Sequence, residues 1–137
     1  MSPQRVASPK TILLVDDDST VVKALGNALT RCGYTVLSAV TLEDAMEASK
    51  RTPEIDLLVV DAVMPQVSGP ELAEILLFLR PTMKVLFITG LDGLTIHLAF
   101  DRPCWCLQKP FTVGQLVSKV QELLQQEQLT DSSLAED

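Results

Sequence analysis

The most constraining feature of the sequence is an alternation of short, continuously apolar runs with stretches of helical periodicity. Residues 12–15 and 57–60 are apolar without interruption, which is typical of strands that are buried on both faces. Between them, apolar residues recur at helical spacing up to Gly33, the expected C-terminal stop of a first helix. Repeated strand–helix units with short connections predict a parallel sheet with helices on both faces, a doubly wound α/β fold.

The same patterns place the remaining elements. Strands are expected at residues 11–15, 34–38, 55–60, 83–88 and 104–107. Helices are expected at 19–32, from a capping pattern at Thr41-Leu-Glu-Asp44 onward, at 70–79, within 91–100 as a short or irregular helix, and along the apolar stripe from Val113 to Leu124. We therefore predict a disordered leader or linker at 1–10, a folded domain at 11–127 and a disordered acidic tail at 128–137.

Length and charge narrow the classes of function. At 137 residues and 15.0 kDa the chain fits one domain. A net charge of −7 argues against direct binding of nucleic acid, because the surface repels phosphate backbones. No apolar run approaches the roughly 20 residues of a membrane span, and residues 1–10 lack the core of a signal peptide. The three cysteines are odd in number and do not suit a framework of disulfides, which favours a reducing compartment. Together these features predict a cytoplasmic protein.

Polar residues follow the strands on the edge where a doubly wound sheet binds its ligands. Asp16 and Asp17 follow the first strand, Asp61 the third, Thr89 the fourth and Lys109 the fifth. Three converging carboxylates repel one another unless a cation is bound, and hard oxygen ligands select Mg²⁺ or a similar ion. A metal, an ammonium and a hydroxyl together suit a transferring phosphoryl group, so the sequence predicts phosphate chemistry.

Four motifs occur in order on these elements: ILLVDDD, LLVVDAVMP with Pro65 four residues after Asp61, FITG and LQKPF. With them the chain resembles the receiver domain of two-component response regulators over about residues 11–127. The resemblance implies a flavodoxin-like fold with five parallel strands in the order 2-1-3-4-5 and five helices. It also implies a phosphoacceptor in a histidine-to-aspartate phosphorelay, with a histidine kinase or a histidine phosphotransfer protein as partner.

The resemblance assigns roles to individual positions. Asp61 is the expected phosphoacceptor, Lys109 pairs with the acyl phosphate and Thr89 moves to hydrogen-bond it. Asp17 is expected to bind Mg²⁺ directly and Asp16 largely through water.

The backbone carbonyl of Val63 would complete the metal shell, together with Asp61 itself. No enzymatic activity is expected beyond self-phosphorylation and self-dephosphorylation, although a parent hybrid histidine kinase remains compatible with the sequence. No output domain is expected, so the signal would pass through protein contact, onward phosphotransfer or feedback on a kinase. A homodimer is also compatible with the sequence.

The sequence is compatible with two forms of receiver. Residues 68–90 and the LQKPFT segment look like receivers at the C-terminal end of hybrid sensor histidine kinases, and residues 1–10 would suit the preceding linker. Met1 instead permits a free-standing regulator.

Two departures from the family pattern predict an atypical or weakened switch. The family usually has Tyr or Phe three residues before the strand-five lysine, and this chain has Cys106 there. Trp105 cannot replace that ring, because neighbouring strand residues face opposite sides of a sheet. The spacing of 20 from Thr89 to Lys109 is also about two residues shorter than the family pattern, which predicts the short helix within 91–100.

Several residues carry plainer interpretations. Asp18 is expected to cap the first helix rather than bind metal, and Thr89 could cap the fourth helix instead of contacting phosphate. His97 is expected to be an ordinary surface or core residue, and Cys104 and Cys106 small apolar strand residues rather than a redox or zinc pair. The apolar run at 75–79 is either an exposed contact patch or a surface covered by neighbouring loops.

Three other functions compete with the phosphorelay. A degenerate receiver would act only as an interaction module, which the cysteine at 106 and the short fourth helix favour. A haloacid-dehalogenase-type enzyme needs a second carboxylate two residues after its nucleophile, and position 63 is Val. A flavodoxin-like cofactor binder shares the architecture, but three acids form a poor site for a flavin phosphate.

Overall fold

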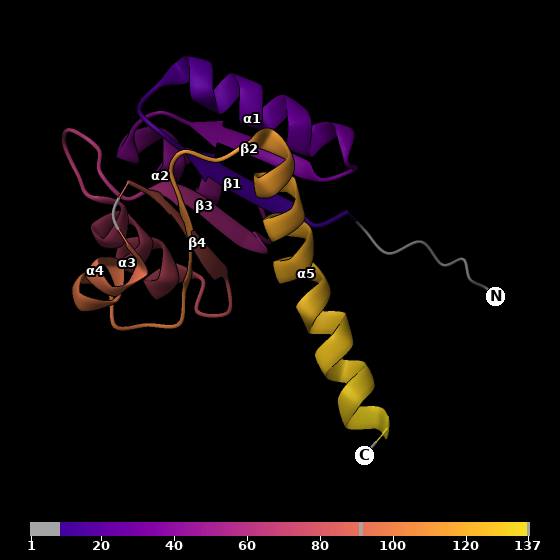
Figure 1. Ribbon diagram of the computed structural model, residues 1–137. Helices are drawn as coiled ribbons and strands as arrows, with labels where there is room; N and C mark the ends of the chain where they lie inside the picture. Colours follow the sequence, from indigo (N-terminus) through magenta and orange to yellow (C-terminus); the bar gives the residue numbers. More distant parts are fainter. Residues whose placement is uncertain (1–8, 91, 137) are drawn as a thin grey trace.

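The fold is a five-stranded parallel sheet between two layers of helices (Figure 1). The computed structural model describes the backbone of residues 9–90 and 92–136, and side chains within these ranges up to residue 125. The strands are ordered β2-β1-β3-β4-β5, which confirms the predicted doubly wound fold and its strand order. Their bounds are β1 Thr11–Val15, β2 Thr35–Ala39, β3 Leu57–Asp61, β4 Lys84–Thr89 and β5 Trp105–Gln108.

Each face of the sheet has its own apolar core. The helices are α1 Ser19–Arg31, α2 Leu42–Lys50, α3 Gly69–Leu79, α4 Gly93–Ala99 and α5 Val113–Glu136. Helices α1 and α5 pack on one face, over side chains such as Leu14 and Val59, while α2, α3 and α4 cover Leu13 and Val60 on the other. Neighbouring residues of one strand thus enter different cores, which explains why the strands are apolar without alternation.

Side-chain caps fix where the helices begin. Asp18 accepts hydrogen bonds from two backbone N–H groups at the start of α1, as the sequence predicted. Thr41 caps α2, also as predicted, and Ser68 forms a capping box with Glu71 at α3. The cap of α4 is Asp92, so the interpretation of Thr89 as that cap was wrong.

Helix α4 has seven residues, which confirms the expectation of a short fourth helix. Of its residues only Ile96 is buried. The helix ends at Phe100, whose ring is 1% exposed and packs edge-to-face on Phe87 with 5.1 Å between ring centroids. Two apolar contacts therefore hold α4 on the sheet.

The predicted boundaries of the folded domain are compared with the structure at both ends of the chain. The sequence predicted no regular structure after Glu127, whereas α5 continues to Glu136. The prediction followed the loss of the apolar stripe, but no Gly or Pro occurs after Gly114 to end the helix. Of the predicted leader, residues 1–8 lie outside the described part, as does Asp137 of the predicted tail. Within the described residues, no helix is long and apolar enough to cross a membrane.

Candidate functional site

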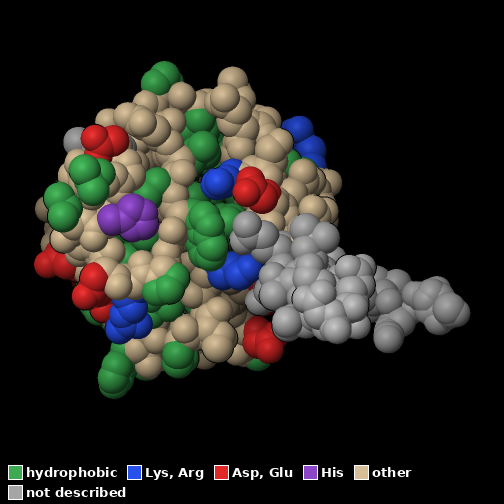
Figure 2. All heavy atoms as spheres, turned by 60° about the horizontal axis from the view of Figure 1, so that its bottom comes forward, with side chains coloured by type: hydrophobic (Ala, Val, Ile, Leu, Met, Phe, Trp, Pro, Cys, Tyr) green, Lys and Arg blue, Asp and Glu red, His purple; other side chains and the backbone are tan. Residues whose placement is uncertain are grey.

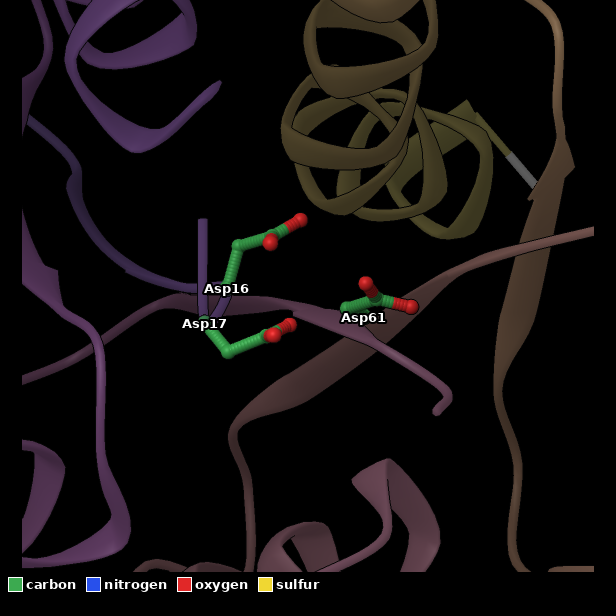
Figure 3. Close-up of side chains that lie close together, drawn as sticks. All are labelled: Asp16, Asp17 and Asp61. Atoms are coloured by element: carbon green, nitrogen blue, oxygen red, sulfur yellow. The ribbon is translucent and has the colours of Figure 1, made fainter. Parts of the chain in front are cut away.

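Three carboxylates meet at the carboxyl edge of the sheet. Asp16 and Asp17 follow β1 directly, and Asp61 is the last residue of β3, the neighbour of β1. One carboxylate oxygen from each residue lies within 4.8 Å of the others, and Figure 3 shows the three side chains turned toward one space. Asp16 and Asp61 are buried and Asp17 is exposed. This set of hard oxygen donors fits a divalent cation of the Mg²⁺ or Ca²⁺ type.

Lys109 supplies the positive charge of the site. Its Nζ lies 3.5 Å from Asp61 Oδ2, and its backbone N–H donates to the carbonyl oxygen of Thr89 at 2.7 Å. The latter bond ties the end of β5 to the end of β4, so the ammonium is held beside the carboxylate by the sheet itself. Because the ammonium remains partly exposed, it can also reach a group that enters from solvent.

The electrostatics of the site centre on Asp16. Burial raises the pKa of Asp16 above its usual value, and the neighbouring Asp61 and Asp17 carboxylates raise it further. The backbone N–H of Asp18, which donates to Asp16 Oδ1 at 2.9 Å, and the charge of Lys109 act in the opposite direction. Three carboxylates thus share this edge with one ammonium, as expected of acids arranged to hold a cation.

Thr89 lies at the edge of this group rather than inside it. It is the last residue of β4, is 1% exposed, and follows Ile88, the β4 residue paired with Asp61. Strand alternation places it on the face of Phe87, toward the α3 and α4 layer. Of the five predicted residues the structure thus brings four together, and Thr89 borders them on the next strand.

The loop after β3 is also part of the site. The backbone N–H of Val63 donates to Asp61 Oδ1 at 3.1 Å, and the Val63 side chain is 66% exposed. This bond holds one carboxylate oxygen, so that the other faces Lys109. The residue two positions after Asp61 offers no carboxylate, which removes the acid–base group of a haloacid-dehalogenase-type enzyme.

Gly69 is a positioning residue that the sequence prediction left just outside the helix expected at 70–79. A Cβ at this position would overlap the carbonyl oxygen of Asp61 and lie 2.8 Å from the Cα of Ala62. The N–H of Gly69 also donates to the carbonyl of Ala62 at 2.9 Å. The start of α3 therefore touches the backbone that carries Asp61, and only glycine permits this approach. The sequence signal was a glycine directly after the capping residue Ser68.

A pocket of about 530 Å³ opens over the carboxylates. Its wall is completed by Val21 on α1, which sequence reasoning did not assign to the site, and by Pro110 and Phe111 of the LQKPF segment after β5. The lining consists of Asp16, Asp17, Asp18, Val21, Asp61, Ile88, Lys109, Pro110 and Phe111. A group the size of a phosphoryl can thus reach Asp61 and Lys109 together.

The region around β5 departs from the expected switch. Cys106 packs in the core under α3 and α4, and Trp105 packs in the core under α1 and α5. The two side chains lie on opposite faces, so the indole does not stand in for the missing ring. Burial raises the pKa of Cys104 to about 11, which keeps its thiol protonated at neutral pH and agrees with an apolar residue; Cys104 lies just before β5 rather than in the strand, where the sequence had predicted it.

The fold and this edge of the sheet identify the class of the protein. The family model described as the response regulator receiver domain matches residues 12–121. The chain therefore belongs to the receiver domain family of two-component response regulators.

Relatives occur in two protein contexts. The chain is 34% identical to the response regulator receiver protein CpdR of Brucella abortus (strain 2308), over 84% of this chain and 97% of the relative. It is 35% identical to the sensor kinase CckA of the same organism, over 85% of this chain but only 13% of the kinase. The chain thus spans a small part of one relative and nearly all of the other.

Solved structures agree with the family. A receiver domain from the hybrid histidine kinase CckA superposes with a TM-score of 0.71 at 31% identity, covering 84% of this chain and 99% of that chain. A CheY-like receiver domain from Methanospirillum hungatei JF-1 gives a TM-score of 0.76 at 29% identity, covering 90% and 99%.

Proposed function

We propose that Asp61 accepts a phosphoryl group from a histidine kinase or a histidine phosphotransfer protein. The observation that carries this proposal is the contact of one buried carboxylate with an ammonium at 3.5 Å and with two further carboxylates at the sheet edge. A nucleophile, a cation site and a fixed positive charge are the parts that phosphoryl transfer needs.

The transfer involves one bond formed and one broken. A carboxylate oxygen of Asp61 attacks the phosphorus of a phosphohistidine or of a small acyl phosphate, forming an O–P bond. The donor's N–P or O–P bond breaks, and its electron pair leaves with the donor, which takes a proton from solvent where its charge requires one. The product is an aspartyl phosphate, a mixed anhydride whose hydrolysis returns Asp61 and inorganic phosphate.

Lys109 and Thr89 act on the transferred group. The Lys109 ammonium offsets the charge repulsion between the carboxylate and the incoming phosphoryl oxygens, and it then pairs with the phosphate. Thr89 hydrogen-bonds the phosphorylated side chain once its hydroxyl turns toward the pocket, which makes this residue the link between phosphorylation and the β4–α4 region.

The carboxylates of Asp16, Asp17 and Asp61, with the backbone carbonyl of Val63, would hold Mg²⁺. A cation held by these groups would supply positive charge beside the phosphoryl oxygens. Asp17 offers an exposed side chain for direct binding, whereas the buried Asp16 is tied to the backbone N–H of Asp18 and is better placed to act through water.

The site is accessible enough for the phosphoryl group on Asp61 to be removed by hydrolysis. A side chain added at Gly90, directly after Thr89, would meet no atom within 4 Å. Water or a phosphatase can therefore approach from this side. We propose that acquiring and hydrolysing this phosphoryl group is the chain's own chemistry, without turnover of a separate substrate.

The two kinds of relative define two settings for this switch. The chain acts either as a free-standing regulator, in the manner of a single receiver, or as the receiver of a hybrid kinase. In both settings the signal would leave this domain through protein contact or onward phosphotransfer. The three free cysteines suit a reducing compartment, and we propose a cytoplasmic location.

The test is phosphorylation by acetyl phosphate, read by intact mass. With Mg²⁺ present, the protein is expected to gain one phosphoryl group, and the gain is expected to disappear with a metal chelator. Asp61→Asn is expected to abolish it, whereas Asp44→Asn, at an exposed aspartate in the first turn of α2, leaves it unchanged. A phosphoadduct that persists in Asp61→Asn would contradict the assignment.

A second candidate is a receiver that acts only through protein contacts. The cysteine at 106 in place of a ring and the seven-residue α4 favour it, because both lie in the region that would respond to phosphorylation. The same mass measurement separates the two candidates, since an interaction module would show no adduct under conditions in which it binds its partner.

A further inference from the structure

A groove runs between α3 and α4 beside the phosphoacceptor site. It has a volume of about 470 Å³ and is lined by Ala62, Val63, Ser68, Pro70, Glu71, Glu74, Thr95, Ile96 and Ala99. We call it the α3–α4 groove. Its residues come from the loop after β3, from the first half of α3 and from one side of α4.

Large apolar side chains are exposed in and beside this groove. Val63 lines the groove and is 66% exposed, whereas Leu94 and Leu98, on α4 but outside the groove lining, are 69% and 82% exposed. The two leucines are four residues apart and share one stripe of the helix. Figure 2 shows green apolar side chains exposed around the purple histidine of α4, with red acidic side chains nearby. Such a cluster on a small domain marks an interaction surface.

The charge of the groove is negative. Glu71 and Glu74 are its charged lining residues, and among the described residues no lysine or arginine lines it. Arg102 pairs with Glu74 at 3.3 Å, and the exposed Asp92 and Asp101 flank α4 at its two ends. One basic side chain, Arg102, thus lies near four acidic ones, on a chain whose net charge is −7. A complementary surface must carry apolar side chains and positive charge.

We propose that the α3–α4 groove docks an amphipathic helix of a partner protein, with an apolar stripe and flanking Lys or Arg residues. The apolar stripe would pack on Val63, Ala99 and the exposed leucines, and the basic residues would face Glu71 and Glu74. The opposite charge steers the encounter and disfavours a second copy of this acidic chain. The proposal concerns the unphosphorylated protein, so it stands apart from the acceptor role of Asp61.

The test uses two fluorescent model peptides and the full chain. Both have about 16 residues, roughly four helical turns, and an identical leucine stripe at i, i+3, i+4 and i+7. One carries lysine and the other glutamate at the flanking positions. We expect the lysine peptide to bind at least about tenfold more tightly by fluorescence anisotropy, with its affinity falling as salt is raised.

Matched variants locate the binding. Ala99→Arg places bulk and positive charge in the groove and is expected to weaken the lysine peptide about tenfold or more. Ala24→Arg makes the same change at an exposed alanine of α1, on the other face of the sheet, and is expected to leave binding unchanged. Glu74→Gln, a milder change, is expected to weaken binding by a smaller factor, about threefold.

Each other outcome overturns the proposal. Equal binding of the two peptides would remove the charge argument. Equal weakening by Ala99→Arg and Ala24→Arg, or by neither, would place the peptide elsewhere. Self-association of the protein in sedimentation, abolished by Ala99→Arg but not by Ala24→Arg, would make a second copy the occupant. Thermal melts identify any variant that fails to fold. If Ala99→Arg does not fold, the binding of the lysine peptide to Glu74→Gln decides whether the groove is the binding site.

Discussion

The edge formed by β1 and β3 and the region formed by β4, α4 and β5 differ in how completely they follow their family. At the first, two buried acids, an exposed acid and a lysine meet, and each buried carboxylate receives a backbone N–H at 2.9 or 3.1 Å. At the second, the helix has seven residues, a cysteine replaces the usual ring, and leucines face solvent. The comparison supports the proposal that this chain accepts a phosphoryl group, and it places the departures from the family pattern in the region expected to respond to phosphorylation.

The largest expected difference between the regions is in how the loss of a lysine changes the rate of phosphorylation. Lys109→Ala removes the ammonium that lies 3.5 Å from Asp61 and is expected to slow phosphorylation by acetyl phosphate about 100-fold, because the incoming phosphoryl group loses its fixed positive charge. Lys119→Ala, on α5, removes a partner of Glu122 at 3.7 Å, away from Asp61, and is expected to leave the rate unchanged. Timed intact-mass measurements give both rates. Similar rates in the two variants would remove Lys109 from the transfer.

Glycines provide a second contrast. Gly69→Ala is expected to slow phosphorylation and lower the melting temperature together, because its Cβ displaces the backbone of Asp61 and Ala62. Gly93→Ala, in the first turn of α4, meets no atom within 4 Å and is expected to leave both quantities almost unchanged. Because a structural defect alone would lower stability, the decisive reading is Mg²⁺ affinity of the folded Gly69→Ala protein. An affinity equal to that of the natural sequence would contradict the positioning role.

The buried acid of the first region gives a pH dependence. Since the folded-state pKa of Asp16 is raised, the native protein holds its proton to a higher pH than the unfolded chain does. Asp16 therefore opposes stability as pH rises above the usual carboxyl range, and this cost is absent below it. Asp16→Asn is expected to raise the melting temperature in metal-free buffer at pH 7, with the gain shrinking as pH falls toward 4.

Thermal melts with a chelator present, at several pH values, check this prediction. Mg²⁺ is expected to narrow the difference, because it stabilises the natural sequence more than the variant. A gain in stability that stays constant with pH would show that charge is not its cause.

The smallest effect is expected at the exposed leucines of the second region. Leu98→Ser is expected to change the free energy of unfolding by less than about 0.5 kcal/mol, because the side chain is 82% exposed. Ile96→Ala, in the same helix, is expected to lower the free energy of unfolding by about 2–4 kcal/mol, because Ile96 is buried. Denaturant unfolding measures both. A large cost at Leu98 would mean that it supports the fold rather than a partner.

The sequence was sufficient where the signal is local or periodic. Uninterrupted apolar strands predicted a sheet covered on both faces, and the acids at their ends predicted the convergence of Asp16, Asp17 and Asp61. Asp18 and Thr41 were identified as caps because a cap needs only its own side chain and the next turn.

Features that depend on packing between distant segments were not predictable in this way. The approach of Gly69 to the Asp61 carbonyl depends on how closely α3 meets β3, which no local pattern records. The extension of α5 to Glu136 was missed because loss of an apolar stripe was read as the end of the helix, although no stop residue follows. The run at 75–79 was left open, and the structure divides it: Leu76 and Leu77 are buried, while Ile75, Phe78 and Leu79 are exposed.

The most direct test of the central claim is to locate the phosphoryl group chemically. After incubation with Mg²⁺ and acetyl phosphate, borohydride reduces an aspartyl phosphate to homoserine, and peptide sequencing by mass spectrometry finds its position. We predict homoserine at residue 61 alone. Homoserine at residue 16 or 17, or at none of the three while the intact mass shows the adduct, would contradict the account.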